Sequence, residues 1–269
     1  MSEYFTLDNG QSLYLEEHGG VSPGSGDRTV VALHGLGGGG YFFAGLGKSL
    51  ASRARVICPD MPGSGFSQCE QAISFDHFAD VIVQLINRKT VGPIVLMGHS
   101  MGTITALKVY ARIPRRIGSL IFVGGLPTPL PEAQARLRDR AGLARSAGMA
   151  AAAPTIVPVV FAGCSLEAIP DKVSMFQRLL ASSDAEGYAQ TALALADASA
   201  ADVVPQVRIP CLCVTGTEDR YAPPAAVRQF ADSISGAEYH ELADCAHMPF
   251  FEAPEAFGKV VQSFLSRTR

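Results

Sequence analysis

A serine between two glycines is the residue of this sequence best suited to act as a nucleophile. Ser100 is the centre of the run GHSMG at residues 98–102, which follows the apolar segment 94–97 and precedes a helical pattern. In a sharp turn between a buried strand and a helix, the two glycines leave room for neighbouring chain and the serine hydroxyl stands exposed above the sheet. Because G-x-S-x-G alone is a weak signal, it is the flanking strand and helix that favour a nucleophile over an ordinary turn serine.

The base that deprotonates Ser100 is expected to be a histidine, since a serine hydroxyl is hardly ionised at neutral pH. The turn resembles that of α/β hydrolases, in which the chain order is serine, acid, histidine, and only His240 and His247 come late enough for that order. His240 falls within a probable strand, at 238–242, where a structural residue is expected. His247 lies in the loop after that strand, which is where catalytic groups are commonly placed, so we predict His247 as the general base.

The acid that orients His247 is predicted to be Asp219. It follows the probable strand 211–215, in the run GTEDRYAP at residues 216–223. Its carboxylate would accept a hydrogen bond from the imidazole and stabilise the protonated ring. The neighbouring Glu218 remains a competitor, and a solvated turn carboxylate is the structural alternative for both residues.

Two backbone N–H groups are expected to hold the oxyanion that forms when a carbonyl is attacked. Met101, directly after the nucleophile, would supply one of them. The glycine-rich run LHGLGGGG at residues 33–40 follows a buried strand, and Leu36 would supply the second. A phosphate-binding loop is the rival interpretation of this run, but no G-K-[ST] follows it.

Residues predicted to contact the substrate come from these loops and from a later helical segment. The loop residues are His34, Gly35, Gly37 and His99, and the apolar residues that could line an acyl pocket are Leu143, Met149, Val159, Phe161, Met175 and Phe176. For the second group, ordinary core packing is the alternative, since most helix-spaced apolar residues are buried for stability alone.

The elements around these motifs predict an α/β protein with a largely parallel sheet. Probable strands alternate with helical patterns, which is typical of βαβ units. The strands are expected at 12–17, 29–33, 55–58, 94–97, 117–123, 211–215 and 238–242, and the helices at 41–53, 74–87, 101–112 and 254–266.

Residues 125–205 differ from this pattern, being helical and alanine-rich without convincing strands. We predict a helical cap here, inserted into an α/β core made of residues 1–124 and 206–269. The uncharged run 146–166 is long enough to suggest a membrane helix. Pro154 and Pro158 would break a spanning helix, so a buried or pocket-lining segment is the prediction.

The composition favours a globular protein that acts on small molecules. Of 269 residues, 48% are hydrophobic and 17% charged, and a net charge of −3 gives no reason to expect nucleic acid or an anionic membrane as partner. The start MSEY lacks the basic and apolar regions of a signal peptide, which predicts a cytoplasmic protein. Six dispersed cysteines are expected to be free thiols, and a homodimer is possible.

Together these motifs resemble the α/β-hydrolase superfamily over essentially the full chain. The shared features, in the expected order, are His34-Gly35, the D-x-P-G-x-G-x-S run at 60–67, the turn at Ser100, Asp219 and His247. The resemblance implies an eight-stranded, mostly parallel sheet, helices on both of its faces, a helical cap over the active site, and a serine hydrolase without metal or organic cofactor. The second half looks like 3-oxoadipate enol-lactonases and small carboxylesterases, whereas the run at 62–67 looks more like C–C bond hydrolases.

The predicted activity is therefore hydrolysis of a small carboxylic ester or lactone through an acyl-serine intermediate. Three alternatives share the fold: a C–C bond hydrolase acting on a vinylogous diketone, a ligand receptor with slow turnover, and a cofactor-free perhydrolase or oxygenase. Haloalkane dehalogenation is excluded by the resemblance, because those enzymes use an aspartate nucleophile and tryptophan ligands, and this chain has Ser100 and no tryptophan.

Overall fold

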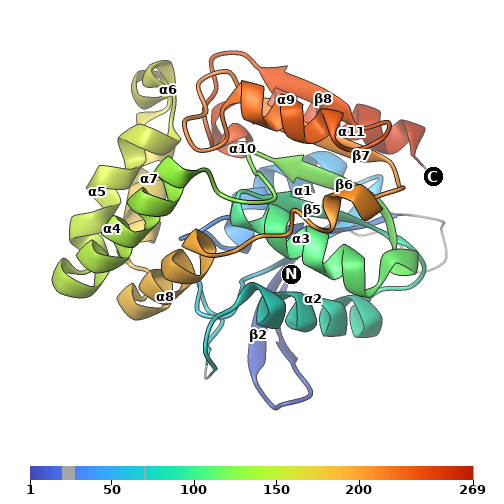
Figure 1. Cartoon of the computed structure of the whole chain (residues 1–269), viewed down its shortest axis with the longest axis horizontal. Coiled ribbons are helices and arrows are strands. Elements are labelled where there is room, and N and C mark those ends of the chain that lie inside the picture. Colours follow the sequence, from blue (N-terminus) through green and yellow to red (C-terminus); the bar gives the residue numbers. More distant parts are fainter. Residues whose placement is uncertain (20–27, 70, 269) are drawn as a thin grey trace.

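An eight-stranded, mostly parallel sheet forms the centre of the molecule, which confirms the predicted fold class (Figure 1). The computed structural model describes residues 1–19, 28–69 and 71–268. The strand order is β1-β2-β4-β3-β5-β6-β7-β8, antiparallel in the pairs β1/β2 and β2/β4 and parallel in the others. The strands are β1 (Ser2–Thr6), β2 (Ser12–His18), β3 (Arg28–Leu33), β4 (Ala54–Pro59), β5 (Ile94–His99), β6 (Ile117–Val123), β7 (Cys211–Gly216) and β8 (Glu238–Leu242).

Helices cover both faces of this sheet, because its central strands are apolar on both sides (Figure 1). Helices α2 and α3 pack against each other on one face, and α1 and α11 on the other. The helices of the core are α1 (Ala44–Leu50), α2 (Phe75–Lys89), α3 (Met101–Arg112), α9 (Pro224–Asp232), α10 (Pro249–Glu252) and α11 (Pro254–Arg267).

Three of these elements, β1, α9 and α10, were not predicted from the sequence. Strand β1 lies at the edge of the sheet and buries only Phe5, so its sequence has no apolar alternation to mark it. Helix α1 is shorter than the predicted helix 41–53, because a 3-10 turn (Gly40–Phe43) precedes it.

The chain reverses its order of strand addition between β3 and β5, and this places a crevice at their carboxyl ends. Leu33 at the end of β3 pairs with Gly98 near the end of β5. The glycine-rich loop after β3 and the turn at Ser100 therefore leave the sheet at the same level, at the same edge. The next strand, β6, ends at the same level, because its last residue, Val123, pairs with His99 at the end of β5.

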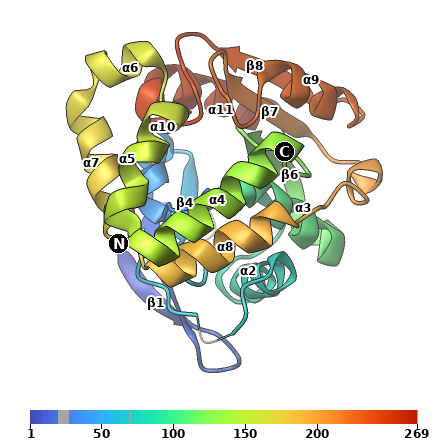
Figure 2. The same cartoon turned by 60° about the vertical axis from the view of Figure 1, so that its left-hand side comes forward.

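Five helices lie between β6 and β7, in the segment predicted as a cap: α4 (Pro131–Ala147), α5 (Met149–Val160), α6 (Gly163–Ala168), α7 (Pro170–Ala181) and α8 (Ala185–Ala196). We call these the inserted helices. Helices α4 and α8 run alongside each other, and α5 packs against both α4 and α7 (Figure 2).

Helix α5 accommodates both Pro154 and Pro158, the residues expected to break a spanning helix. A proline removes the hydrogen bond to the carbonyl four residues earlier. Those carbonyls belong to Ala150 and Pro154, which are exposed, so water can satisfy them. Within the described ranges, no helix combines the length and the apolar character needed to cross a membrane.

Candidate active site

The turn at Ser100 has the strained backbone that presents a nucleophile. Ser100 has a φ of 53° and a ψ of −116°, a conformation that non-glycine residues rarely adopt. Its N–H donates to the Val123 carbonyl at 2.9 Å, which ties the turn to β6. A Cβ at Gly98 would approach the Gly102 carbonyl oxygen to 2.3 Å, and one at Gly102 would approach the Leu33 oxygen to 2.5 Å. The two glycines of the motif are therefore required by close backbone packing.

His247 and Asp219 form a buried hydrogen-bonded pair. The imidazole Nδ1 lies 2.8 Å from Asp219 Oδ2, and the aspartate side chain is completely buried. Asp219 Oδ1 accepts hydrogen bonds from the backbone N–H groups of Tyr221 at 2.8 Å and Ala222 at 3.0 Å. A carboxylate that accepts at Nδ1 leaves Nε2 free to act as a base. The competing residue, Glu218, is exposed to solvent.

Gly124 is needed for this pair to form. It follows β6 with a φ of +52°, and a Cβ there would lie 3.0 Å from Asp219 Oδ2 and 3.2 Å from His247 Nδ1. A side chain at this position would meet both members of the pair.

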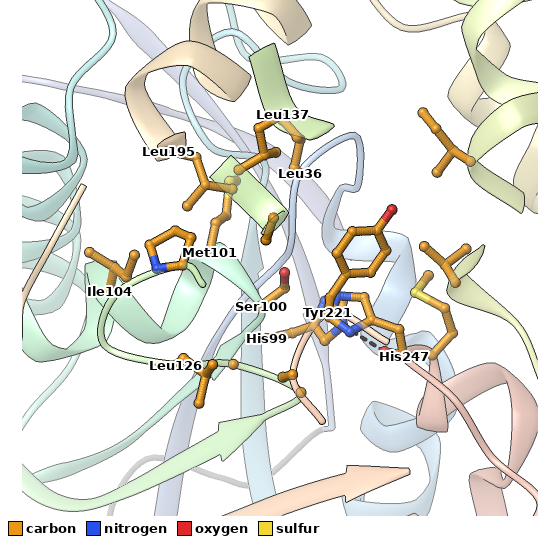
Figure 3. A pocket seen from close by; sticks show the side chains of 18 of the residues that line it. Leu36, His99, Ser100, Met101, Ile104, Leu126, Leu137, Leu195, Tyr221 and His247 are labelled. Carbon is orange, nitrogen blue, oxygen red and sulfur yellow. Dashed lines mark hydrogen bonds between the residues drawn. The ribbon is translucent and has the colours of Figure 1, made fainter. Parts of the chain in front are cut away.

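Ser100 and His247 line the same pocket, between the sheet edge and the inserted helices (Figure 3). The empty space of the pocket, counted together with its open mouth, is about 780 Å³. In the described part of the chain no direct hydrogen bond joins the Ser100 hydroxyl to His247, an arrangement common where no substrate is bound.

The two backbone N–H groups predicted to hold an oxyanion are available for this role. Leu36 and Met101 both line the pocket. Among the described residues, neither N–H donates to another protein group. Met101 is the first residue of α3, where a helix leaves its N–H groups without intrahelical partners.

His99 and His34 are buried structural histidines with defined hydrogen bonds. His99 Nε2 lies 2.9 Å from the carbonyl oxygen of His247 and so carries the proton. Burial, with the neighbouring His247, lowers the pKa of His99 well below its ordinary value. His34 donates from Nδ1 to the Gly35 carbonyl at 2.7 Å and accepts the Met61 N–H at Nε2, at 2.9 Å.

Glu252 holds the loop of His247 against the inserted helices, a role that its sequence position did not reveal. Its Oε1 accepts the N–H groups of Ala246 at 3.0 Å and Met248 at 2.9 Å, the residues on either side of His247. Its Oε2 accepts the N–H of Ala162, at 2.8 Å, just after α5. The N–H of His247 itself donates to the carbonyl of Val160 on α5, at 3.0 Å.

Most residues predicted to contact substrate lie outside the pocket lining. His99 and Phe176 are part of the lining, but His34, Gly35, Gly37, Leu143, Met149, Val159, Phe161 and Met175 are not. The Phe161 ring packs on Phe176 with centroids 5.4 Å apart, and Gly37 lines a separate small hollow beside Tyr188. Helical spacing identified these apolar residues, but not which of them face the pocket rather than the core.

The lining also contains residues that were not predicted from the sequence, among them Phe42, Arg140, Tyr188 and Tyr221. Only Tyr221, two residues after Asp219, had a signal in its position. No group of three or more His, Cys, Asp or Glu side chains in the described ranges is arranged to hold a metal ion. The six cysteines, all within those ranges, are free thiols, as predicted.

Comparisons with known proteins agree with this geometry. The family model of the alpha/beta hydrolase fold matches residues 28–254. A 2-hydroxy-6-oxononadienedioate/2-hydroxy-6-oxononatrienedioate hydrolase of Escherichia coli (strain K12 / DH10B) is 28% identical over 260 residues, covering 91% of this chain and 89% of the relative.

An enol-lactonase and an esterase are among the solved structures that share the whole architecture. An enol-lactonase from Burkholderia xenovorans LB400 is 27% identical with a TM-score of 0.91, covering 98% of this chain and 100% of that one. A thermophilic esterase from Thermogutta terrifontis, with malate bound, is 25% identical with a TM-score of 0.89, covering 99% of this chain and 98% of that one. Since the family model spans most of the chain, this protein belongs to the alpha/beta hydrolase fold family.

Proposed function

We propose that this protein hydrolyses a carboxylic ester or lactone of a small molecule, with Ser100 as nucleophile, His247 as base and Asp219 as the orienting acid. The observation that carries the proposal is that Ser100, on a strained turn, shares a pocket with His247, whose Nδ1 lies 2.8 Å from Asp219. The relatives named as esterase and enol-lactonase support this reaction class.

In the first half of the proposed reaction, the Ser100 oxygen forms a bond to the acyl carbon while His247 Nε2 takes the hydroxyl proton. The carbonyl electron pair moves to the oxygen, which the N–H groups of Leu36 and Met101 would stabilise. The bond to the alcohol oxygen then breaks, and His247 gives its proton to that oxygen. With a lactone, the released hydroxyl stays attached to the acyl group.

In the second half, water attacks the acyl-serine as His247 removes one of its protons. The bond between the acyl carbon and the Ser100 oxygen breaks, the serine regains its proton from His247, and the carboxylic acid leaves. The apolar lining of the pocket, which includes Leu137, Ile156 and Val160 from the inserted helices, would accommodate the acyl or alcohol part.

The test is the release of p-nitrophenol from acetate, butyrate and octanoate esters. We expect burst or steady-state turnover with a chain-length preference in the wild type, and a loss of at least about 10⁴-fold in kcat in Ser100→Ala. The control is Ser146→Ala, an exposed serine on α4 outside the pocket, which should keep wild-type activity. Turnover that persists in Ser100→Ala would remove Ser100 as the nucleophile.

C–C bond hydrolysis is the second candidate, because the relative from Escherichia coli is named for a dienedioate substrate. The same three residues would act on a vinylogous diketone, whose conjugated chromophore disappears on cleavage. Turnover of such a diketone with poor rates on simple esters would replace the ester proposal. Binding without turnover on any of these substrates would instead indicate a receptor of the same fold.

A further inference from the structure

A single permanently charged side chain enters a pocket whose lining is mostly apolar. Arg140, on α4, lines the pocket together with Leu137 of the same helix and Tyr188 of α8. Of the described residues that line it, Arg140 alone carries a permanent charge, and none is an aspartate or glutamate. Arginine is rarely placed in such surroundings unless something pairs with it.

Arg140 differs from Arg138 and Arg145 of the same helix, α4, in having no acidic partner. Arg138 pairs with Asp197 at 2.6 Å and Arg145 with Glu186 at 2.8 Å, both on the outer surface. In the described ranges, Arg140 makes no ion pair or hydrogen bond with any carboxylate. Its guanidinium carbon instead lies 4.9 Å from the centre of the Tyr221 ring, beside the triad.

The electrostatic surroundings of Arg140 leave it in need of an anion. Burial lowers the pKa of Arg140, and the nearby Arg136, 5.6 Å from the same tyrosine ring, lowers it further. Tyr188, which is 4% exposed, raises the pKa through its attraction to Arg140 and a side-chain hydrogen bond with it, but a neutral phenol does not balance the positive charge. A guanidinium nevertheless stays protonated in proteins, so the positive charge persists in a partly buried place beside Tyr188 and Tyr221.

We propose that Arg140 is an anion-binding subsite, and that the substrate is an ester or lactone carrying a carboxylate away from the scissile bond. This inference rests on the proposed hydrolytic function and names its substrate class. The planar guanidinium fork matches a carboxylate with two parallel hydrogen bonds, and one cation neutralises one carboxylate. A phosphate, with up to two negative charges at neutral pH, would leave an unpaired charge in the apolar pocket.

The turnover test compares pairs of p-nitrophenyl esters that differ only in charge. Half-esters of glutarate, adipate and pimelate are set beside monoacid esters in which an isopropyl group replaces the carboxylate. The wild type is expected to prefer one half-ester over its neutral partner. Arg140→Gln should lower kcat/KM for that half-ester by about 10- to 100-fold and leave the neutral ester little changed. Arg140→Lys should recover part of the loss.

The matched control is Arg138→Gln, which removes a positive charge from the surface of the same helix. This variant should change kcat/KM neither for the preferred half-ester nor for its neutral partner. Equal losses on charged and neutral esters in Arg140→Gln would mean that Arg140 only supports the helix packing. A wild type with no preference for any half-ester would also overturn the proposal, while the hydrolytic function would stand.

Binding without turnover separates failure of this inference from failure of the proposed reaction. Mono-p-nitroanilides of the same three diacids are titrated by calorimetry into Ser100→Ala and into Ser100→Ala with Arg140→Gln. One outcome is that no ester is turned over, but one anilide binds to Ser100→Ala and its affinity falls at least about 10-fold when Arg140→Gln is added. The anion-binding subsite would then stand, and the protein would catalyse a reaction other than ester hydrolysis. No binding of any anilide to Ser100→Ala overturns the subsite.

Discussion

The two carboxylate oxygens of Asp219 have different partners, and this makes the residue difficult to replace. Oδ2 faces His247 Nδ1, while Oδ1 accepts two backbone N–H groups. Every one of these partners donates. A group in this place must therefore accept hydrogen bonds on both sides, and only a carboxylate does so.

Asp219→Asn is expected to lower kcat on the butyrate ester by about 10³- to 10⁴-fold. The amide would keep Oδ1 facing the two N–H groups and turn its NH₂ toward His247, which forces the imidazole into the tautomer with Nε2 protonated. The control is Glu218→Gln, next to Asp219 but exposed, which should retain wild-type kcat. If Glu218→Gln were the variant that lost activity, the acid would have been misassigned.

At the scale of elements, the loop of His247 is fixed between the core and the inserted helices. Glu252, the last residue of α10, accepts N–H groups on both sides of His247 and one beyond α5. His247 itself donates to α5 through its backbone. A movement of α5 would therefore move the histidine, so the inserted helices help to position the proposed base as well as to line the pocket.

Glu252→Gln is expected to lower kcat on the butyrate ester by about 10-fold with little change in KM. The amide nitrogen cannot accept, so one or more of the three N–H groups loses its partner, at about 1–3 kcal/mol each. Hydrogen–deuterium exchange of residues 243–252 should become faster in the same variant. The control is Glu255→Gln, exposed on α11. Unchanged exchange and unchanged kcat in Glu252→Gln would show that the loop is held by other contacts.

At the scale of the whole molecule, the buried histidines make stability depend on pH. His99, the last residue of β5, is buried against the loop of His247, and burial lowers its pKa well below the ordinary value. As pH falls below about 6.5, the unfolded chain binds a proton at this position and the folded protein does not. The stability contributed by neutral His99 is present at higher pH and is lost as pH falls below the unfolded value.

The wild type is therefore expected to lose about 1.4 kcal/mol of unfolding free energy from His99 alone between pH 7.5 and pH 5.5. His99→Gln keeps an N–H donor for the His247 carbonyl but does not titrate in this range, so its loss over the same interval should be smaller by about this amount. Urea unfolding at pH 7.5 and pH 5.5 measures the loss of unfolding free energy in the wild type and in His99→Gln. His240→Gln, on the exposed part of β8, should behave as the wild type. Equal losses in His99→Gln and the wild type would contradict the burial argument.

Local patterns in the sequence determined a large part of this structure. Runs of apolar residues without alternation marked the central strands, and β6 was predicted with its observed bounds, 117–123. Buried parallel strands have this signal because both of their faces are covered. The edge strand β1 lacks it, since a strand with one buried residue has no period to detect. Helix α5 was not predicted, because Pro154 and Pro158 indicate a broken helix. The helix accommodates them because both fall on its exposed side, and only the packing decides which side that is.

The sequence by itself also predicted Ser100, Asp219 and His247 as the candidate catalytic residues, because each follows a strand and strands of a parallel sheet end at a common edge. Only the tertiary structure decided what surrounds them. Arg140 and Glu252 lie far from Ser100 in the chain and have no motif, and they reach the site through the placement of α4 and α10. Phe161 and Leu143 have the helical spacing expected of pocket residues but lie outside the pocket lining, and the Phe161 ring packs on Phe176. Periodicity defines the face of a helix that is buried, whereas the neighbours of that face are set by contacts between distant segments.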